Sequence, residues 1–173
     1  MMEIEMPKIA VEESENRSYA KIVVEPLEKG FGLTLGNALR RILLSALPGI
    51  AIQNIKFSED LGIKHEFSAV PFVKEDVTEI ILNFKCVAIK STCMDKDYKK
   101  TVKLVKEGPA VVKAGDIVCD ADMEVLNPDQ YICTIDEGGK VDLELTIGRG
   151  RGYQGAVEHK TDIIDNIAID SIY

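Results

Sequence analysis

The stretch TLGNALRRILLSAL, residues 34–47, says more about the fold than any other part of this 173-residue sequence. Its leucine, isoleucine and alanine side chains recur every three or four residues, which is the period of an amphipathic α-helix. Thr34 is a residue type that favours the position before a helix, and Pro48-Gly49 ends helices. The pattern therefore predicts a helix over 34–47 that is capped by Thr34.

The apolar face of this predicted helix is unusually wide. It covers about half of the circumference, more than the stripe by which a surface helix usually packs on its own core. A face of this width has room for the helix's own sheet and for a second copy of the chain. We expect a dimer interface at a set of apolar residues on this face: Leu35, Leu39, Ile42, Leu43 and Ala46.

The opposite face of the helix is polar but contains one large apolar residue. Asn37, Arg40, Arg41 and Ser45 make up this face, and Leu44 lies in its middle. Two interpretations remain open. Leu44 is either a stray surface leucine, which is common, or the apolar anchor of a docking surface, because arginine beside such an anchor is frequent at protein interfaces.

The rest of the chain predicts a mixed α+β fold. A strand at 18–25 precedes the helix, and a strand at 50–57 follows it. A second helix is expected over 73–84, with Glu75 and Asp76 in its first turn, where acidic residues suit the helix dipole. Short strands then alternate with glycine and proline turns, and the predicted strands are 86–90, 101–105, 122–126, 131–135, 141–147 and 167–172. The strict alternation in 141–147 predicts a half-buried strand.

Charge and hydropathy exclude several classes of protein. The chain has 21 basic and 29 acidic residues, a net charge of −8, which argues against broad coating of nucleic acid. No stretch approaches the roughly 20 consecutive apolar residues of a membrane helix. The segment 1–10 carries two glutamates and lacks the apolar run of a signal peptide. We expect a cytoplasmic protein that does not bind membranes.

The cysteines and histidines predict no metal site. Cys86, Cys93, Cys119 and Cys133 form no Cys-x-x-Cys pair and have no histidines clustered near them. We expect free, reduced and mostly buried thiols.

Two glycine-containing segments invite binding hypotheses. Gly30, Gly32 and Gly36 precede the first helix, but Leu35 stands where a dinucleotide-binding fingerprint needs its third glycine, so no cofactor is expected. The segment from Arg149 to Tyr153 could contact RNA through arginine and tyrosine, although a bent loop held by glycines is the simpler interpretation. No catalytic motif is present, and no catalytic residue is assigned.

The residues from Leu27 to Ser45 (LEKGFGLTLGNALRRILLS) resemble the signature of bacterial RNA polymerase alpha subunits. Further segments resemble the same family in the same order: 64–67 (KHEF), 73–83 (VKEDVTEIILN), 148–153 (GRGRGY) and 167–172 (IAIDSI). The resemblance spans essentially the whole chain. One difference is Phe72, which stands where the family usually has a small residue.

The resemblance implies a two-part fold and an assembly role. It implies a dimerisation and assembly domain formed by 1–49 and 167–173, which is incomplete because the family continues beyond Tyr173, and an inserted, mostly antiparallel domain at 50–166. In this family two alpha subunits dimerise and recruit the beta and beta-prime subunits, and beta-prime holds the catalytic magnesium. The implied contacts with beta or beta-prime are Arg41 and Leu44, assisted by Arg40 and Asn37, with weaker ones at Lys85 and Ile169.

The resemblance thus predicts a non-catalytic subunit of DNA-directed RNA polymerase without direct DNA binding by this part. An alternative from another class is a stand-alone β-rich module whose arginine–glycine loop binds RNA. A nucleotide-dependent enzyme is a third possibility, and it would be stabilised by dinucleotides.

Overall fold

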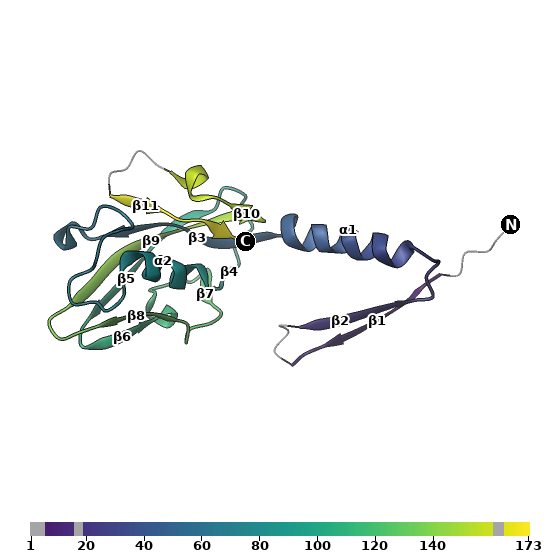
Figure 1. Cartoon of the computed structure of the whole chain (residues 1–173), viewed down its shortest axis with the longest axis horizontal. Coiled ribbons are helices and arrows are strands. Elements are labelled where there is room, and N and C mark those ends of the chain that lie inside the picture. Colours follow the sequence, from purple (N-terminus) through teal and green to yellow (C-terminus); the bar gives the residue numbers. More distant parts are fainter. Residues whose placement is uncertain (1–5, 16–18, 161–164) are drawn as a thin grey trace. The chain divides into compact units, whose positions relative to one another are not determined.

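The computed structural model describes residues 6–15, 19–160 and 165–173, and the chain forms two compact units, Met1–Leu44 and Ser45–Tyr173 (Figure 1). The first unit contains strands β1 (Lys8–Glu13) and β2 (Ala20–Glu25) and helix α1 (Phe31–Ser45), which ends at the boundary between the units. The second unit contains every other element. As predicted, the fold is α+β with mostly antiparallel strands.

In the first unit, β1 and β2 form an antiparallel hairpin in which Lys8 lies opposite Glu25 and Glu13 opposite Ala20. The pattern of the sequence did not indicate β1. The strand predicted at 18–25 corresponds to β2, which begins at Ala20. Ser18 lies outside the described residues. Ile9 and Val11 of β1 lie opposite Val24 and Ile22 of β2, so that these side chains share one face of the hairpin.

Helix α1 confirms the predicted helix but not its cap. It begins at Phe31, so Thr34 lies inside the helix, where its Oγ1 donates to the Gly30 carbonyl at 3.5 Å. The N-cap prediction is wrong because the chain turns earlier: Gly30 has a φ of +94°, which glycine adopts readily. The helix ends at Ser45, two residues before 47, since the residue before a proline disfavours helical geometry.

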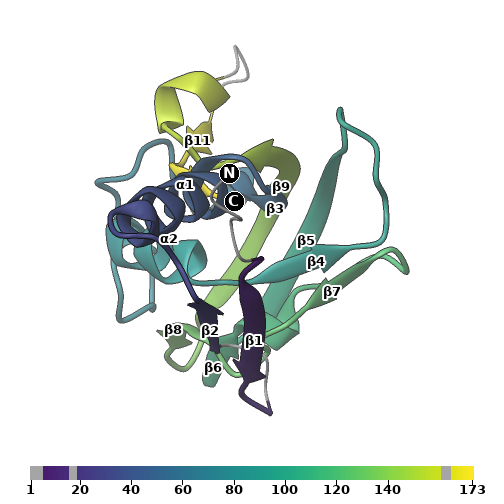
Figure 2. The same ribbon diagram turned by 90° about the vertical axis from the view of Figure 1, so that its right-hand side faces the viewer.

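The second unit is built on a sheet with the strand order β5-β9-β3-β4-β7, and β11 also pairs with β3 (Figure 2). All of these pairings are antiparallel. Two smaller sheets pair β6 with β8 and β10 with β12. The strands of this unit are β3 (Pro48–Phe57), β4 (Ile89–Ser91), β5 (Lys99–Glu107), β6 (Ala110–Lys113), β7 (Met123–Val125), β8 (Tyr131–Ile135), β9 (Lys140–Arg151), β10 (Tyr153–Gln154), β11 (Asn166–Ala168) and β12 (Ser171–Ile172).

Most predicted strands are present with shifted ends. The strand expected at 86–90 begins only at Ile89, because Cys86 caps the preceding helix. The single strand expected at 167–172 is split into β11 and β12 around Ile169 and Asp170. The short strands β6 and β10 were not predicted. The described residues of this unit also form short 3-10 helices at Glu59–Leu61, Ala114–Asp116 and Ala156–His159.

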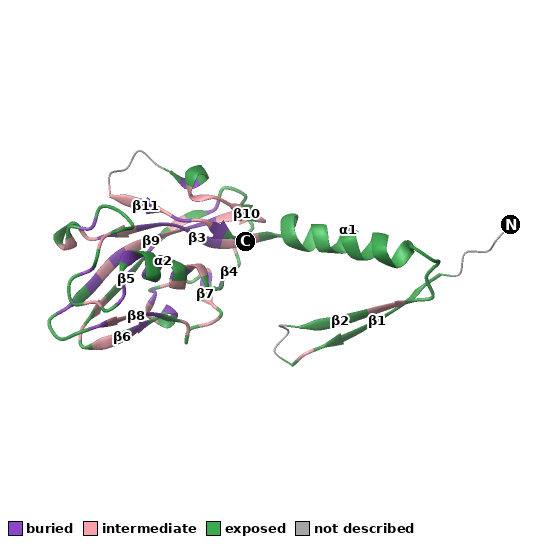
Figure 3. Cartoon of the chain, viewed as in Figure 1, coloured by how far each residue is buried: buried purple, intermediate pink, exposed green. Residues whose placement is uncertain are grey.

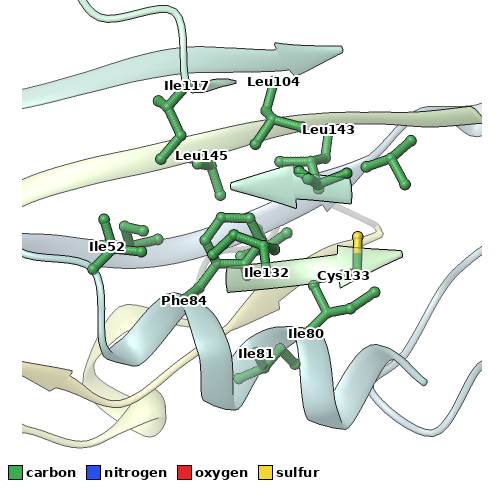
Figure 4. Close-up of a cluster of buried hydrophobic side chains, with 14 of the residues drawn as sticks. Ile52, Ile80, Ile81, Phe84, Leu104, Ile117, Ile132, Cys133, Leu143 and Leu145 are labelled. Atoms are coloured by element: carbon green, nitrogen blue, oxygen red, sulfur yellow. The ribbon is translucent and has the colours of Figure 1, made fainter. Parts of the chain in front are cut away.

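Helix α2 (Val77–Lys85) begins later than Val73, where the apolar periodicity starts. Asp76 is its N-cap, and its Oδ1 accepts a hydrogen bond from the backbone N–H of Glu79 at 2.7 Å, so it satisfies one of the unpaired donors of the first turn. Glu75 therefore precedes the helix. The apolar side of α2, which includes Ile80 and Phe84, packs on the sheet (Figure 4).

Strand β9 confirms the predicted alternation. Val141, Leu143, Leu145 and Ile147 are all at most 1% exposed, while the residues between them are half-buried. These four side chains lie on one face of the strand and form the centre of the core. The strand continues to Arg151, so the bent loop predicted from Arg149 is wrong: pairing of residues 148–151 with β3 holds this segment extended.

The four cysteines are free, as expected, but they are not mostly buried. Only Cys133 is buried; Cys93 and Cys119 are half-buried and Cys86 is exposed at the end of α2. In the described part of the chain, neither α-helix has the length and apolar character needed to cross a bilayer.

Candidate functional site

Helix α1 buries none of its residues (Figure 3). The large side chains of its apolar face are 38 to 64% exposed: Leu35 38%, Leu39 41%, Ile42 50% and Leu43 64%. Ala46 is exposed too and lies one residue beyond the end of the helix. Monomeric soluble proteins rarely leave contiguous apolar faces of this kind open, so α1 has the character of an interface helix.

The polar face of α1 brings the four main docking candidates together. Asn37, Arg40, Arg41 and Leu44 follow the spacing i, i+3, i+4 and i+7, which places them on one side of a helix. All four are exposed, and the side chain of Leu44 is 61% exposed. This face offers guanidinium groups with planar donor geometry beside an apolar anchor.

The two weaker candidates belong to the second unit and are brought close to each other. The Lys85 Nζ, at the end of α2, forms an ion pair of 2.7 Å with Oδ2 of Asp170, the neighbour of Ile169. Asp170 Oδ1 also accepts the backbone N–H of Ala156 at 2.9 Å. The hydrogen bond from Lys85, and then that from Ala156, lower the pKa of the Asp170 carboxyl.

Ile169 itself belongs to the core. Its side chain is 3% exposed, and its backbone N–H donates to the Gln53 carbonyl at 3.0 Å. A partner that binds at this point would therefore contact the residues next to Ile169 rather than the Ile169 side chain. Sequence reasoning missed Asp170, because a pair separated by 85 residues leaves no local signal.

The arginine–glycine segment has a structural role that the RNA hypothesis did not anticipate. The Arg149 guanidinium donates to the Cys93 carbonyl at 2.6 Å and contacts the Met94 sulfur at 3.5 Å. A Cβ on Gly150 would lie 2.4 Å from the Tyr173 ring, so this glycine allows a close approach. The segment is thus part of an ordered sheet.

The described residues contain no candidate metal centre. Among them, no group of three or more histidine, cysteine or acidic side chains is placed to hold a metal ion. Gly30 makes the turn before α1, and Gly32 and Gly36 lie inside the helix.

Comparison with known proteins identifies the family. A family profile described as "RNA polymerase Rpb3/RpoA insert domain" matches residues 50–173. The sequence is also 52% identical over 176 aligned residues to the DNA-directed RNA polymerase subunit alpha of Alkaliphilus metalliredigens (strain QYMF), and the alignment covers 100% of this chain. The chain belongs to the bacterial RNA polymerase alpha subunit family.

Other members of the alpha family are equally similar. The alpha subunits of Desulfitobacterium hafniense (strain DSM 10664 / DCB-2) and Clostridium botulinum (strain Hall / ATCC 3502 / NCTC 13319 / Type A) are each 53% identical over the whole chain. In each of these comparisons the match covers 54% of the relative, so the chain spans about half the length of the alpha subunits that it resembles. It corresponds to their N-terminal region.

Proposed function

We propose that this chain is an assembly scaffold of a bacterial DNA-directed RNA polymerase and acts in transcription in the cytoplasm. In this proposal the apolar face of α1 meets the same helix of a second copy. The polar face, with Asn37, Arg40, Arg41 and Leu44, receives the beta or beta-prime subunit, and Lys85 and the segment at Ile169 add weaker contacts. The chain contributes no catalytic group.

The observation that carries the proposal is that α1 buries none of its residues. This 15-residue helix has two opposite exposed faces, one apolar and one with arginines around Leu44. Burying the leucines in a dimer removes apolar area from water, at about 25 cal/mol per Å². The arginines then supply directional contacts to a different partner, which is the composition of binding hot spots.

The division of the chain is part of the same proposal. An assembly domain of 1–49 and 167–173 would flank an inserted domain of 50–166. The start of the family match at residue 50 supports the first of these boundaries. The second boundary has no such support, since β11 and β12 both lie in the sheets of the second unit.

The test is charge reversal on the polar face of α1. Arg41→Glu, in the alpha subunit co-expressed with its beta and beta-prime subunits, should reduce co-purification of beta at least about tenfold, since truncating or reversing one member of an interfacial charge pair costs several kcal/mol. Lys29→Glu is the matched control, because it makes the same charge change at an exposed residue before the helix.

Sedimentation of the same variants separates assembly from dimerisation. Arg41→Glu should leave the monomer–dimer equilibrium of the alpha subunit unchanged, because Arg41 lies on the face opposite to Leu39 and Leu43. Normal recovery of beta with Arg41→Glu would remove the docking role. An equal loss with Lys29→Glu would attribute the effect to net charge alone.

A further inference from the structure

A cleft in the second unit gathers three basic side chains that the assembly proposal does not use. It is lined by Pro48, Lys96, Arg149, Gly150 and Arg151. Among these described residues there is no acidic side chain. Arg149 and Arg151 are two positions apart in β9 and therefore share one face of that strand, and Lys96 comes from the turn between β4 and β5.

The cleft is held in place by Arg149. Its guanidinium donates to the carbonyl of Cys93 at 2.6 Å and contacts the sulfur of Met94 at 3.5 Å, so it ties the connection between β4 and β5 to the end of β9. This connection carries Lys96. The Arg149 guanidinium and the backbone near Lys96 thus have positions that are set before any ligand arrives, which lowers the entropic cost of binding.

Two of the three basic side chains of the cleft have no acidic partner in the described part of the chain. Within residues 6–15, 19–160 and 165–173, neither Lys96 nor Arg151 takes part in an ion pair. The neighbouring Lys100, by contrast, is paired with Asp120 at 2.9 Å and with Asp122 at 2.6 Å. We propose that this cleft binds a short acidic segment of a protein partner, whose carboxylates pair with Arg151 and Lys96.

Carboxylates suit this cleft better than a nucleic-acid backbone. A guanidinium pairs with a carboxylate through two parallel hydrogen bonds, so a few acidic residues saturate the site. Nucleic-acid grooves track many phosphates and add stacking aromatic rings, but the residues that line this cleft include three basic side chains and no aromatic ring. The inference goes beyond the assembly role, because it does not involve α1.

A fluorescent octaglutamate peptide tests the proposal on the 173-residue protein by anisotropy at low salt. Lys96→Gln/Arg151→Gln should weaken binding roughly five- to tenfold, as expected for the loss of two exposed charge pairs. Lys64→Gln/Lys90→Gln is the control, since it removes the same charge from two exposed lysines elsewhere in the unit. It should leave the affinity within about twofold of the unsubstituted protein, as neither lysine lines the cleft.

Three outcomes would overturn the proposal. In the first outcome, the peptide does not bind at low salt. In the second, both double variants weaken peptide binding equally, which would mean that only net charge matters. In the third outcome a single-stranded dT12 oligonucleotide binds more tightly than the peptide and depends on Lys96 and Arg151, which would assign the cleft to nucleic acid. Circular dichroism of each variant checks that the fold is retained. Because α1 is unchanged in all of them, failure here leaves the assembly proposal untouched.

Discussion

At the scale of single residues, Phe72 carries a backbone cost. Its φ is +58°, in the left-handed region, and its side chain is 64% exposed. Its carbonyl accepts the backbone N–H of Asp136 at 2.7 Å, which holds the turn in this conformation. A residue with a Cβ costs about 1–2 kcal/mol there.

Phe72→Gly should therefore stabilise the protein. Relief of the left-handed strain outweighs the greater freedom that glycine has in the unfolded chain, about 0.5–1 kcal/mol, and leaves a net gain of up to about 1 kcal/mol. The expected rise in the melting temperature is about 2–4 °C by circular dichroism. Phe72→Ala keeps the Cβ and is the control. An equal rise with alanine would show that loss of the exposed ring, rather than backbone strain, is responsible.

At the scale of elements, the end of strand β9 packs closely against Tyr173, and Gly150 allows this close approach. The Tyr173 hydroxyl accepts a hydrogen bond from Nε2 of Gln53 at 2.8 Å, and its backbone N–H donates to the Gly152 carbonyl at 2.9 Å. With both ends of the residue held, the ring lies over Gly150, where an added Cβ would be 2.4 Å away. Gly150 is thus required for close approach.

Gly150→Ala should destabilise the protein by about 1–3 kcal/mol, the usual cost of overpacking, as measured by urea denaturation. Gly155→Ala is the matched control, because its Cβ would meet only the Tyr153 hydroxyl at 4.0 Å. In a Tyr173→Ala background the cost of Gly150→Ala should largely disappear, since the obstructing ring is gone. A cost that persists in that background would place its origin in the strand backbone.

At the scale of the whole molecule, the core belongs to one unit. Among the described residues, every buried side chain lies between Ala51 and Ser171, within the unit Ser45–Tyr173. The described residues of the other unit form a two-stranded hairpin and one helix, and each of these is marginal in water when isolated. Folding stability should therefore reside in the second unit.

A fragment of residues 45–173 should fold alone and unfold cooperatively, with a urea midpoint close to that of the 173-residue chain, because it keeps the whole core. The complementary fragment of residues 1–44 should show little secondary structure by circular dichroism. An unfolded 45–173 fragment would mean that the first unit contributes essential contacts. Leu145→Ala in the 45–173 fragment should lower the urea midpoint, because truncating this buried side chain costs about 2–5 kcal/mol.

Several parts of the fold and site followed from the sequence alone. The helical period between Leu35 and Leu44 identified α1 and both of its faces, and strict alternation identified the buried side of β9. Glu75 and Asp76 were predicted in the first turn of α2, but Asp76 is its N-cap and Glu75 precedes the helix. These features depend on neighbours a few residues away, and local periodicity is set by helix and strand geometry.

Other features were decided only by tertiary structure. The early start of α1 at Phe31, the extension of β9 to Arg151 and the split of the last strand depend on a glycine φ and on pairing with distant strands. The ion pair of Lys85 with Asp170, the ring of Tyr173 over Gly150 and the basic cleft at Arg151 join residues far apart in the chain. Sequence periodicity reports which face of an element is apolar, but contacts between elements arise only when the chain folds and brings those faces together.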